Sequence, residues 1–291
     1  KMNAIVFPGQ GSQVVGMGID FYNNFEIVKK IFKEADEKLN YKISKIILEG
    51  PEDQLKLTEN TQPAILIVSF AIFSVLKKEF NFNFNLSKFF AGHSLGEYSA
   101  LVCSESLTFS DALFLLFERG KAMQEAVPVG KGSMLAVLGA DISKVKEFII
   151  NSNLSNGICE IANDNAEGQV IVSGDTETIN SFQSNLKKEK IKTIPLKVSA
   201  PFHCSLMKPA AKNMENKINN TKFEKPIFEI VNNVTANPEI TPVNLKRLLI
   251  EQIFSTVRWR ESLIKMHEKG IKNFIEIGPG KVLIGMAKRT L

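Results

Sequence analysis

The pentapeptide G-H-S-L-G at residues 92–96 constrains the fold more than any other part of this chain. It follows the apolar run Phe89–Ala91, and a short buried strand that enters a sharp turn carrying a serine is the nucleophile-elbow arrangement. Small residues are needed two positions to either side of Ser94, because the backbone turns too tightly there to admit a side chain. A helix from Glu97 would direct its first amides at the serine, and the amide of Leu95 could stabilise an oxyanion. An ordinary glycine-rich turn between a strand and a helix would show the same five residues.

Composition limits the class of protein. The chain has 291 residues, of which 44% are hydrophobic and 23% charged, as in a soluble globular protein of one large or two modest domains. The net charge of +5 is mild, and the sequence has no dense cluster of basic residues interleaved with aromatic ones. Nucleic-acid binding is therefore disfavoured, whereas an acidic partner or a phosphate-bearing ligand would suit this charge.

The cysteines, the first residues and the apolar runs all favour a cytoplasmic protein. The three cysteines, Cys103, Cys159 and Cys204, are far apart and odd in number, which argues against a disulfide framework or a structural zinc site. The first residues contain no secretory signal, so we expect none. The longest apolar run, Ala64–Leu76, is too short to span a bilayer and predicts a buried core helix that begins at Pro63. No membrane association is expected.

The order of elements predicts an α/β protein with two parts. A strand at 4–7, a loop at 8–13, an amphipathic helix at 20–39, the elbow and a helix at about 110–126 come first. Residues 80–84 alternate phenylalanine with asparagine, which leaves strand and loop both open. After a linker at 128–132, the predicted elements are strand 133–138, helix 142–150, strands 159–163 and 169–173, helix 176–188 and strand 192–198. A strand at 228–231, helices at 242–254 and 260–269 and a strand at 274–277 then return to the first pattern.

The middle part has the β-α-β-β-α-β order of a ferredoxin-like unit. We therefore expect a large α/β catalytic subdomain formed by residues 1–127 and 199–291. Residues 128–198 would be a small subdomain inserted into it.

A nucleophilic serine needs a base, and the chain has three histidines. His93 is adjacent to Ser94, and neighbouring side chains at such a turn usually point apart. His267 lies among charged residues on a predicted helix and is expected to face solvent. His203, in a proline-containing loop after the small unit, is the best remaining candidate, although a loop histidine often has a structural role.

Arg119 interrupts an apolar stripe on the helix after the elbow. The stripe is formed by Ala112, Leu115, Leu116 and Met123. A guanidinium on a core-facing stripe is costly unless it is paired. It could pair with a structural carboxylate or bind a ligand carboxylate through two hydrogen bonds, and the spacing by itself favours the structural pairing.

Other motifs are weaker. Residues 9–14 resemble the start of G-x-G-x-x-G, but Val14 replaces the third glycine, so dinucleotide binding is disfavoured. There is no Walker-A loop and no His/Asp/Glu group with metal-ligand spacing, so neither a bound cofactor nor a metal is expected.

Five motifs together resemble the malonyl-CoA:acyl carrier protein transacylase family of bacterial fatty-acid synthesis. They are F-P-G-Q-G-S-Q at 7–13, G-H-S-L-G-E-Y-S-A-L at 92–101, Arg119, P-F-H at 201–203 and E-I-G-P-G at 276–280. They stand in the family's order over the whole length. The resemblance implies a hydrolase-like α/β core with an inserted ferredoxin-like small subdomain, in agreement with the element order.

The resemblance also implies roles for individual residues. Ser94 matches the acylated nucleophile, His203 its base, and Arg119 the arginine that binds the malonyl carboxylate. Gln10 matches the residue whose amide joins that of Leu95 in the oxyanion hole. The backbone carbonyl of Gln252 would orient the histidine in place of an acidic triad member. Phe202 resembles variants that favour malonyl over branched units, and Asn163 and Asn165 would face the site from the small subdomain.

The implied reaction is ping-pong transfer of a malonyl group from malonyl-CoA to the phosphopantetheine thiol of acyl carrier protein, by a monomer and without a cofactor. A serine hydrolase would share Ser94 and His203, but Arg119 favours the transferase because it offers a charged acyl group a partner. A non-catalytic module that binds carrier protein would need no nucleophile.

Overall fold

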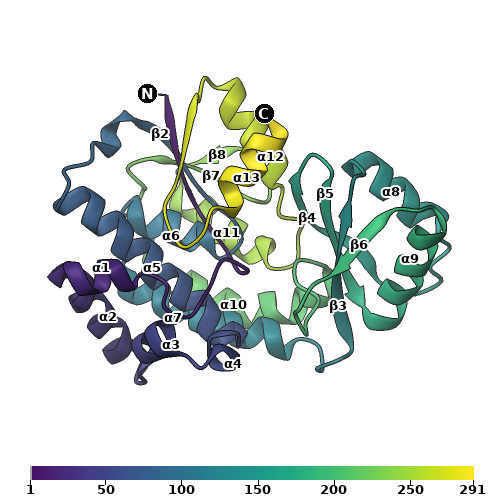
Figure 1. Cartoon of the computed structure of the whole chain (residues 1–291), viewed down its shortest axis with the longest axis horizontal. Coiled ribbons are helices and arrows are strands. Elements are labelled where there is room, and N and C mark those ends of the chain that lie inside the picture. The colour runs from purple at the N-terminus through teal and green to yellow at the C-terminus, as the bar shows by residue number, and fades with distance from the viewer. Residues whose placement is uncertain (1) are drawn as a thin grey trace.

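Two separate β-sheets organise the chain, and the computed structural model describes residues 2–291 of it (Figure 1). The larger sheet has five strands, in the spatial order β8 (Pro238–Glu239), β7 (Glu229–Val231), β2 (Ser87–Gly92), β1 (Asn3–Phe7) and β9 (Asn273–Glu276). The smaller sheet has four strands, in the order β4 (Cys159–Ala166), β5 (Gln169–Asp175), β3 (Gly132–Leu138) and β6 (Lys192–Pro195).

The larger sheet is parallel except at the β7–β8 edge. Strand β1 pairs in parallel with β2 and β9, and β2 pairs in parallel with β7. Ile5 and Phe7 enter the hydrophobic core on one face, and Ala4 and Val6 enter a second core on the other. A strand buried on both faces has no polar alternation, which explains the continuous apolar runs in the sequence. The carboxyl ends of the parallel strands meet at one edge, where their loops gather.

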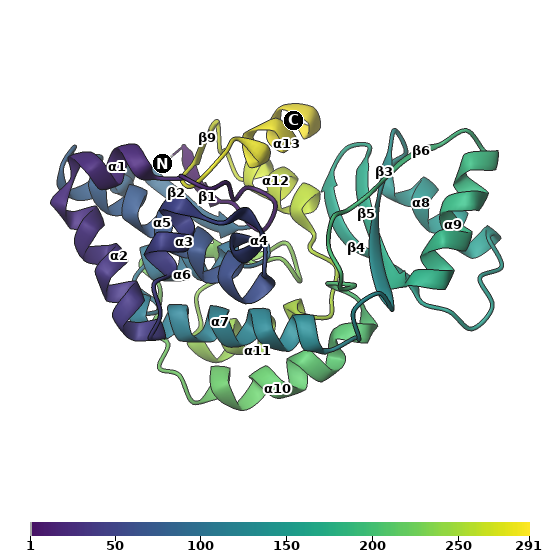
Figure 2. The same cartoon turned by 60° about the horizontal axis from the view of Figure 1, so that its bottom comes forward.

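Helices cover both faces of the larger sheet, as Figure 2 shows. One side carries α1 (Ile19–Asn24), α2 (Glu26–Leu39), α3 (Ile43–Glu49), α4 (Glu52–Leu55), α5 (Thr58–Lys78), α6 (Gly96–Cys103), α7 (Phe109–Glu125), α10 (Lys208–Asn219) and α11 (Pro242–Gln252). The other side carries α12 (Trp259–Glu268) and α13 (Val282–Thr290). The fold class expected from the sequence, α/β with a separate small sheet, is thus confirmed.

The smaller sheet is antiparallel throughout and has a hydrophobic core of its own. Helices α8 (Ile142–Asn151) and α9 (Thr176–Lys188) pack on it, and its strand order is that of a ferredoxin-like unit. Strand β6 ends at Pro195, three residues earlier than the predicted strand at 192–198.

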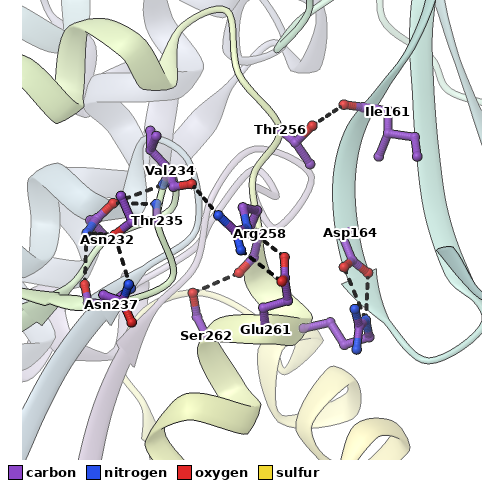
Figure 3. A network of polar contacts seen from close by, with 11 residues as sticks. Ile161, Asp164, Asn232, Val234, Thr235, Asn237, Thr256, Arg258, Glu261 and Ser262 are labelled. Carbon is purple, nitrogen blue, oxygen red and sulfur yellow. Dashed lines mark hydrogen bonds and ion pairs between the residues drawn. The ribbon is translucent and has the colours of Figure 1, made fainter. Parts of the chain in front are cut away.

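A short segment before α12 joins the two sheets (Figure 3). The Asp164 backbone N–H in β4 donates a hydrogen bond of 2.9 Å to the carbonyl of Val257, and the Thr256 hydroxyl donates one of 2.6 Å to the carbonyl of Ile161. The buried Asp164 carboxylate also forms an ion pair of 3.0 Å with Arg260. The small sheet is therefore held against the carboxyl edge of the large one.

The predicted helix at 20–39 is two helices, because the backbone is extended at Phe25 between α1 and α2. Asparagine has low helix propensity, and the Asn24 side chain donates to the Asp20 carbonyl, which ends α1. The extended backbone turns the Phe25 ring onto Phe80, with the two ring centroids 5.8 Å apart.

Helix α5 begins at Thr58, five residues before the predicted start, so Pro63 lies inside the helix. The first turn is polar but buried, because its side chains reach tertiary partners: Asn60 accepts from the Tyr41 hydroxyl and donates to the Gln54 carbonyl. By length and composition this helix could cross a membrane, but 78% of its apolar window is buried inside the protein. It is a core helix, as the sequence predicted.

Residues 80–84, for which the sequence left both strand and loop open, form a loop. This loop leads into a short 3-10 helix, Phe84–Leu86, before β2. The rings of Phe82 and Phe84 pack against each other at a tilt, with their centroids 4.7 Å apart, and Phe84 is buried in the core. The alternation of phenylalanine with asparagine therefore belongs to a loop that its phenylalanine side chains anchor.

Candidate active site

The elbow has the strand–turn–helix geometry that its sequence predicted. Ser94 lies between β2 and α6 with a φ of +55°. A Cβ on Gly92 would lie 1.8 Å from the Gly96 carbonyl oxygen, and one on Gly96 would lie 2.3 Å from that of Phe7. Only glycine fits these two positions, and the turn they permit raises the Ser94 side chain above the carboxyl edge of the sheet.

Ser94 and His203 form a hydrogen-bonded pair. The distance between Ser94 Oγ and His203 Nε2 is 2.7 Å, and His203 Nδ1 lies 2.8 Å from the backbone carbonyl oxygen of Gln252. Because a carbonyl can only accept, Nδ1 carries the proton and Nε2 is the free acceptor. The hydroxyl of Ser94 therefore donates to a ring nitrogen that can take its proton.

The small sheet helps to hold the loop that carries His203. The Ser173 hydroxyl in β5 donates a hydrogen bond of 2.7 Å to the Phe202 carbonyl. On the other side of the histidine, the backbone N–H and the hydroxyl of Ser205 donate to the Glu160 carboxylate at 2.8 and 2.6 Å. These contacts explain how His203 keeps a φ of +56°, a region that non-glycine residues rarely adopt.

Burial, the largest cause, and the nearby charge of Arg119 together lower the pKa of His203 to about 3, against the opposing hydrogen bond to Gln252. The imidazole is therefore neutral at pH 7, as a general base must be. Burial has the opposite effect on Glu97, a carboxyl group of α6, and raises its pKa to about 7.

The pH profile should reflect these values. Because a lowered pKa keeps Nε2 unprotonated in acid, we expect kcat/KM to show no acid limb from His203 near 6.5, the ordinary histidine value. The measurement is kcat/KM against pH in the wild type and in Glu97→Gln, which removes the buried carboxyl group whose pKa is raised to about 7. A limb near the ordinary histidine value that persists in Glu97→Gln would contradict this prediction.

Arg119 is fully buried beside the serine, and its hydrogen-bond partners are neutral. Its Nη1 donates to Gln62 Oε1 at 2.7 Å, and its Nη2 donates to Gln252 Oε1 at 2.8 Å and to Ser94 Oγ at 3.3 Å. The ring of Tyr98 lies 5.6 Å from the guanidinium carbon. Within residues 2–291, Arg119 has no ion pair and its Nε–H has no partner. The structural ion pair that the spacing favoured is thus absent from the described residues, and the site offers a cation to an acyl carboxylate.

The two amides expected to stabilise an oxyanion lie on either side of the elbow. Leu95 directly precedes α6, and Gln10 follows Gly9, where a Cβ would lie 2.4 Å from the His93 carbonyl oxygen. Across the part of the chain that the structure describes, neither the Gln10 nor the Leu95 backbone N–H donates to a protein acceptor. Both are available to a ligand.

The other histidines and the small-sheet asparagines have different positions. His93 Nε2 lies 2.7 Å from Asn165 Oδ1, and its ring packs on Trp259, so this histidine is directed toward the small sheet. His267 is exposed at the end of α12. Asn163 is buried in β4 and pairs through its backbone with Val257, and within residues 2–291 it has no hydrogen bond to Ser94, His203 or Arg119. Phe202 is buried in the main core next to His203.

The sequence interpretation missed three residues of the site: Gln62, Glu97 and Asn233. Gln62 ends the polar first turns of α5, just before its apolar part, and Glu97 is the one charged residue of α6. Asn233 follows the apolar strand β7 at the carboxyl edge of a parallel sheet, where ligand-binding residues gather. This position, directly after a predicted strand, was the signal in the sequence that could have identified Asn233 as a site residue. No group of three or more potential metal ligands occurs among residues 2–291.

A serine that is hydrogen-bonded to a histidine and lies beside a buried arginine, at the carboxyl edge of an α/β sheet, fits an acyl transferase. In agreement, the family model described as the acyl transferase domain matches residues 4–291. A malonyl CoA-acyl carrier protein transacylase of Bacillus subtilis is 41% identical over 289 residues, which span 99% of this chain and 90% of the relative. The chain belongs to the malonyl-CoA:acyl carrier protein transacylase family.

Solved structures agree with this assignment. An acyl carrier protein S-malonyltransferase from Vibrio cholerae is 39% identical and superposes with a TM-score of 0.95, covering 99% of this chain and 94% of that one. A malonyl-transacylase solved in complex with its type II PKS acyl-carrier protein is 38% identical, with a TM-score of 0.95 and coverage of 100% and 93%.

Proposed function

We propose that this protein transfers a malonyl group from malonyl-CoA to the phosphopantetheine thiol of acyl carrier protein, through an acyl-Ser94 intermediate. The observation that carries the proposal is the position of Arg119, whose Nη2 lies 3.3 Å from the same serine oxygen that contacts His203. A nucleophile beside a buried guanidinium that has no carboxylate partner suits an acyl group that ends in a carboxylate.

The first half-reaction forms the acyl-enzyme. Ser94 Oγ attacks the thioester carbonyl carbon, and its proton moves to His203 Nε2. The negative charge that develops on the carbonyl oxygen accepts hydrogen bonds from the amides of Gln10 and Leu95. The carbon–sulfur bond then breaks, and the CoA sulfur takes the proton from His203. The thiol of the carrier protein repeats these steps in reverse, giving its proton to His203 and displacing Ser94.

Further residues complete the proposed site. Arg119 binds the malonyl carboxylate through Nε and Nη2, which form one edge of the guanidinium. The carbonyl of Gln252 orients His203, and Phe202 limits the size of the acyl group. Asn163 would contact the substrate from the small sheet.

The proposal extends to the arrangement and surroundings of the chain. Residues 1–127 and 199–291 would form the catalytic subdomain and residues 128–198 the small one. We expect a cytoplasmic monomer that associates with neither nucleic acid nor membrane and needs no bound cofactor or metal.

The acceptor distinguishes a transferase from a serine hydrolase. We expect malonyl-enzyme, freed of excess malonyl-CoA, to lose its acyl group much faster to phosphopantetheinylated carrier protein than to buffer. Because the chain carries a net charge of +5, transfer to an acidic carrier should slow as salt rises.

The measurement is intact mass spectrometry of both proteins over time, with carrier protein lacking the phosphopantetheine group as the control. Hydrolysis that outruns transfer would favour the hydrolase instead.

A further inference from the structure

Asn233 is a buried residue whose side chain contacts the elbow on both sides of His93, directly before the nucleophile. It is fully inaccessible to solvent and lies in the loop that follows β7. The Ser94 backbone N–H donates a hydrogen bond of 2.8 Å to Asn233 Oδ1, and Asn233 Nδ2 donates one of 2.8 Å to the Gly92 carbonyl. One side-chain amide thus holds the two peptide groups that flank His93, in the turn that presents the serine.

The same amide is linked to the base and the arginine through Gln252. Gln252 Nε2 donates to Asn233 Oδ1 and to the Ser94 carbonyl, both at 3.0 Å. The Gln252 side-chain oxygen accepts from Arg119, and its backbone carbonyl accepts from His203. Hydrogen bonds at both the oxygen and the nitrogen of the Gln252 side-chain amide therefore fix its orientation. Asn233 provides one of the acceptors for the nitrogen.

The backbone of Asn233 is anchored as well. Its N–H donates to the Glu97 carboxylate, which lies on the first turn of the helix that leaves the elbow. Strand β2, helix α6 and the loop after β7 are thereby joined at one residue. The loop after β7 lies more than a hundred residues beyond β2 and α6 in the chain, so their relative position depends on contacts such as these.

From this arrangement we infer that Asn233 is a positioning residue that holds the nucleophile, the base and the arginine in one geometry. This inference rests on the proposed function for the identity of the acyl group. An asparagine suits the place because the site uses both a donor and an acceptor within one neutral amide. Leucine would supply neither, and aspartate would supply only the acceptor.

The neighbouring Asn232 provides a matched control. Its side chain closes the turn at 232–237, where it donates to the Thr235 hydroxyl and the Asn237 carbonyl (Figure 3). It has no contact with Ser94 or Gln252 among its hydrogen bonds. Asn232→Asp therefore removes a similar donor from the same loop and leaves the elbow untouched.

The experiment compares Asn233→Asp, Asn233→Leu and Asn232→Asp with the wild type. Two rates are measured: acylation by malonyl-CoA in a single turnover, and sulfonylation of Ser94 by phenylmethanesulfonyl fluoride, which needs the serine–histidine pair but no carboxylate site. A misplacement of about 1 Å costs on the order of a hundredfold in rate. We expect both Asn233 variants to lose about 10- to 100-fold in both rates, the leucine variant more than the aspartate one.

Thermal unfolding of each variant separates positioning from stability. We expect Asn232→Asp to lose stability while it retains both rates. Folded Asn233 variants that react at wild-type rates, or an Asn232→Asp variant slowed as much as Asn233→Asp, would overturn the inference. If Asn233→Leu does not fold, Asn233→Asp, which keeps the shape and the acceptor, decides the matter. A wild type that is sulfonylated but not malonylated would contradict the proposed function, while the sulfonylation rates still test Asn233.

Discussion

Replacement of Ser94 by alanine should abolish the malonyl adduct and leave the fold intact. The Ser94 hydroxyl lies 2.7 Å from His203 Nε2, so its removal takes away the atom that would carry the acyl group. The backbone contacts that hold the elbow use the Ser94 N–H and carbonyl, and alanine keeps both. Intact mass spectrometry after brief exposure to malonyl-CoA measures the adduct, and thermal unfolding measures the stability.

Ser99→Ala is the matched control for this prediction. Ser99 lies on the helix that leaves the elbow, and its hydroxyl is buried without a hydrogen-bond partner. Its loss should leave the adduct at wild-type yield. An adduct of normal yield in Ser94→Ala, mapped to another residue, would remove Ser94 from the mechanism.

Replacement of Arg119 by alanine should change the choice of substrate. A malonyl carboxylate can accept two parallel hydrogen bonds from the guanidinium, whereas acetyl-CoA leaves this buried charge without a partner. Loss of a charge-assisted pair in a closed site should cost on the order of a hundredfold in kcat/KM for malonyl-CoA. Relative use of acetyl-CoA should rise. The measurement is kcat/KM for both substrates in both proteins.

Arg119→Lys tests the geometry of the pair apart from its charge. Lysine keeps the cation but cannot reproduce the planar fork, so we expect malonyl transfer to be only partly restored. If the ratio of malonyl to acetyl use is the same in the wild type and in Arg119→Ala, the arginine has a structural role. Its contacts to Gln62 and Gln252 would then be the reason for its burial.

Local sequence patterns predicted the elements well where short-range sterics or periodicity determine the structure. The glycines at 92 and 96 required the elbow, and the alternating elements from β3 to β6 predicted the small sheet with its two helices. The pattern failed where a tertiary contact prevailed over it. The apolar stripe at 20–39 continues through Phe25, but the backbone is extended at this residue and its ring packs on Phe80.

The sequence by itself determined the position of the elbow, the two-part α/β order and the histidine best suited to meet the serine. These follow from backbone sterics, from the periods of helix and strand, and from elimination among three histidines. Only the tertiary structure decided the partners of Arg119 and the places of Gln62, Glu97 and Asn233. The spacing favoured a structural ion pair for the arginine, and the structure surrounds it with neutral amides instead. These residues come from helices α5, α6 and α11 and from the loop after β7, and contacts between such distant segments produce no periodic pattern in the sequence.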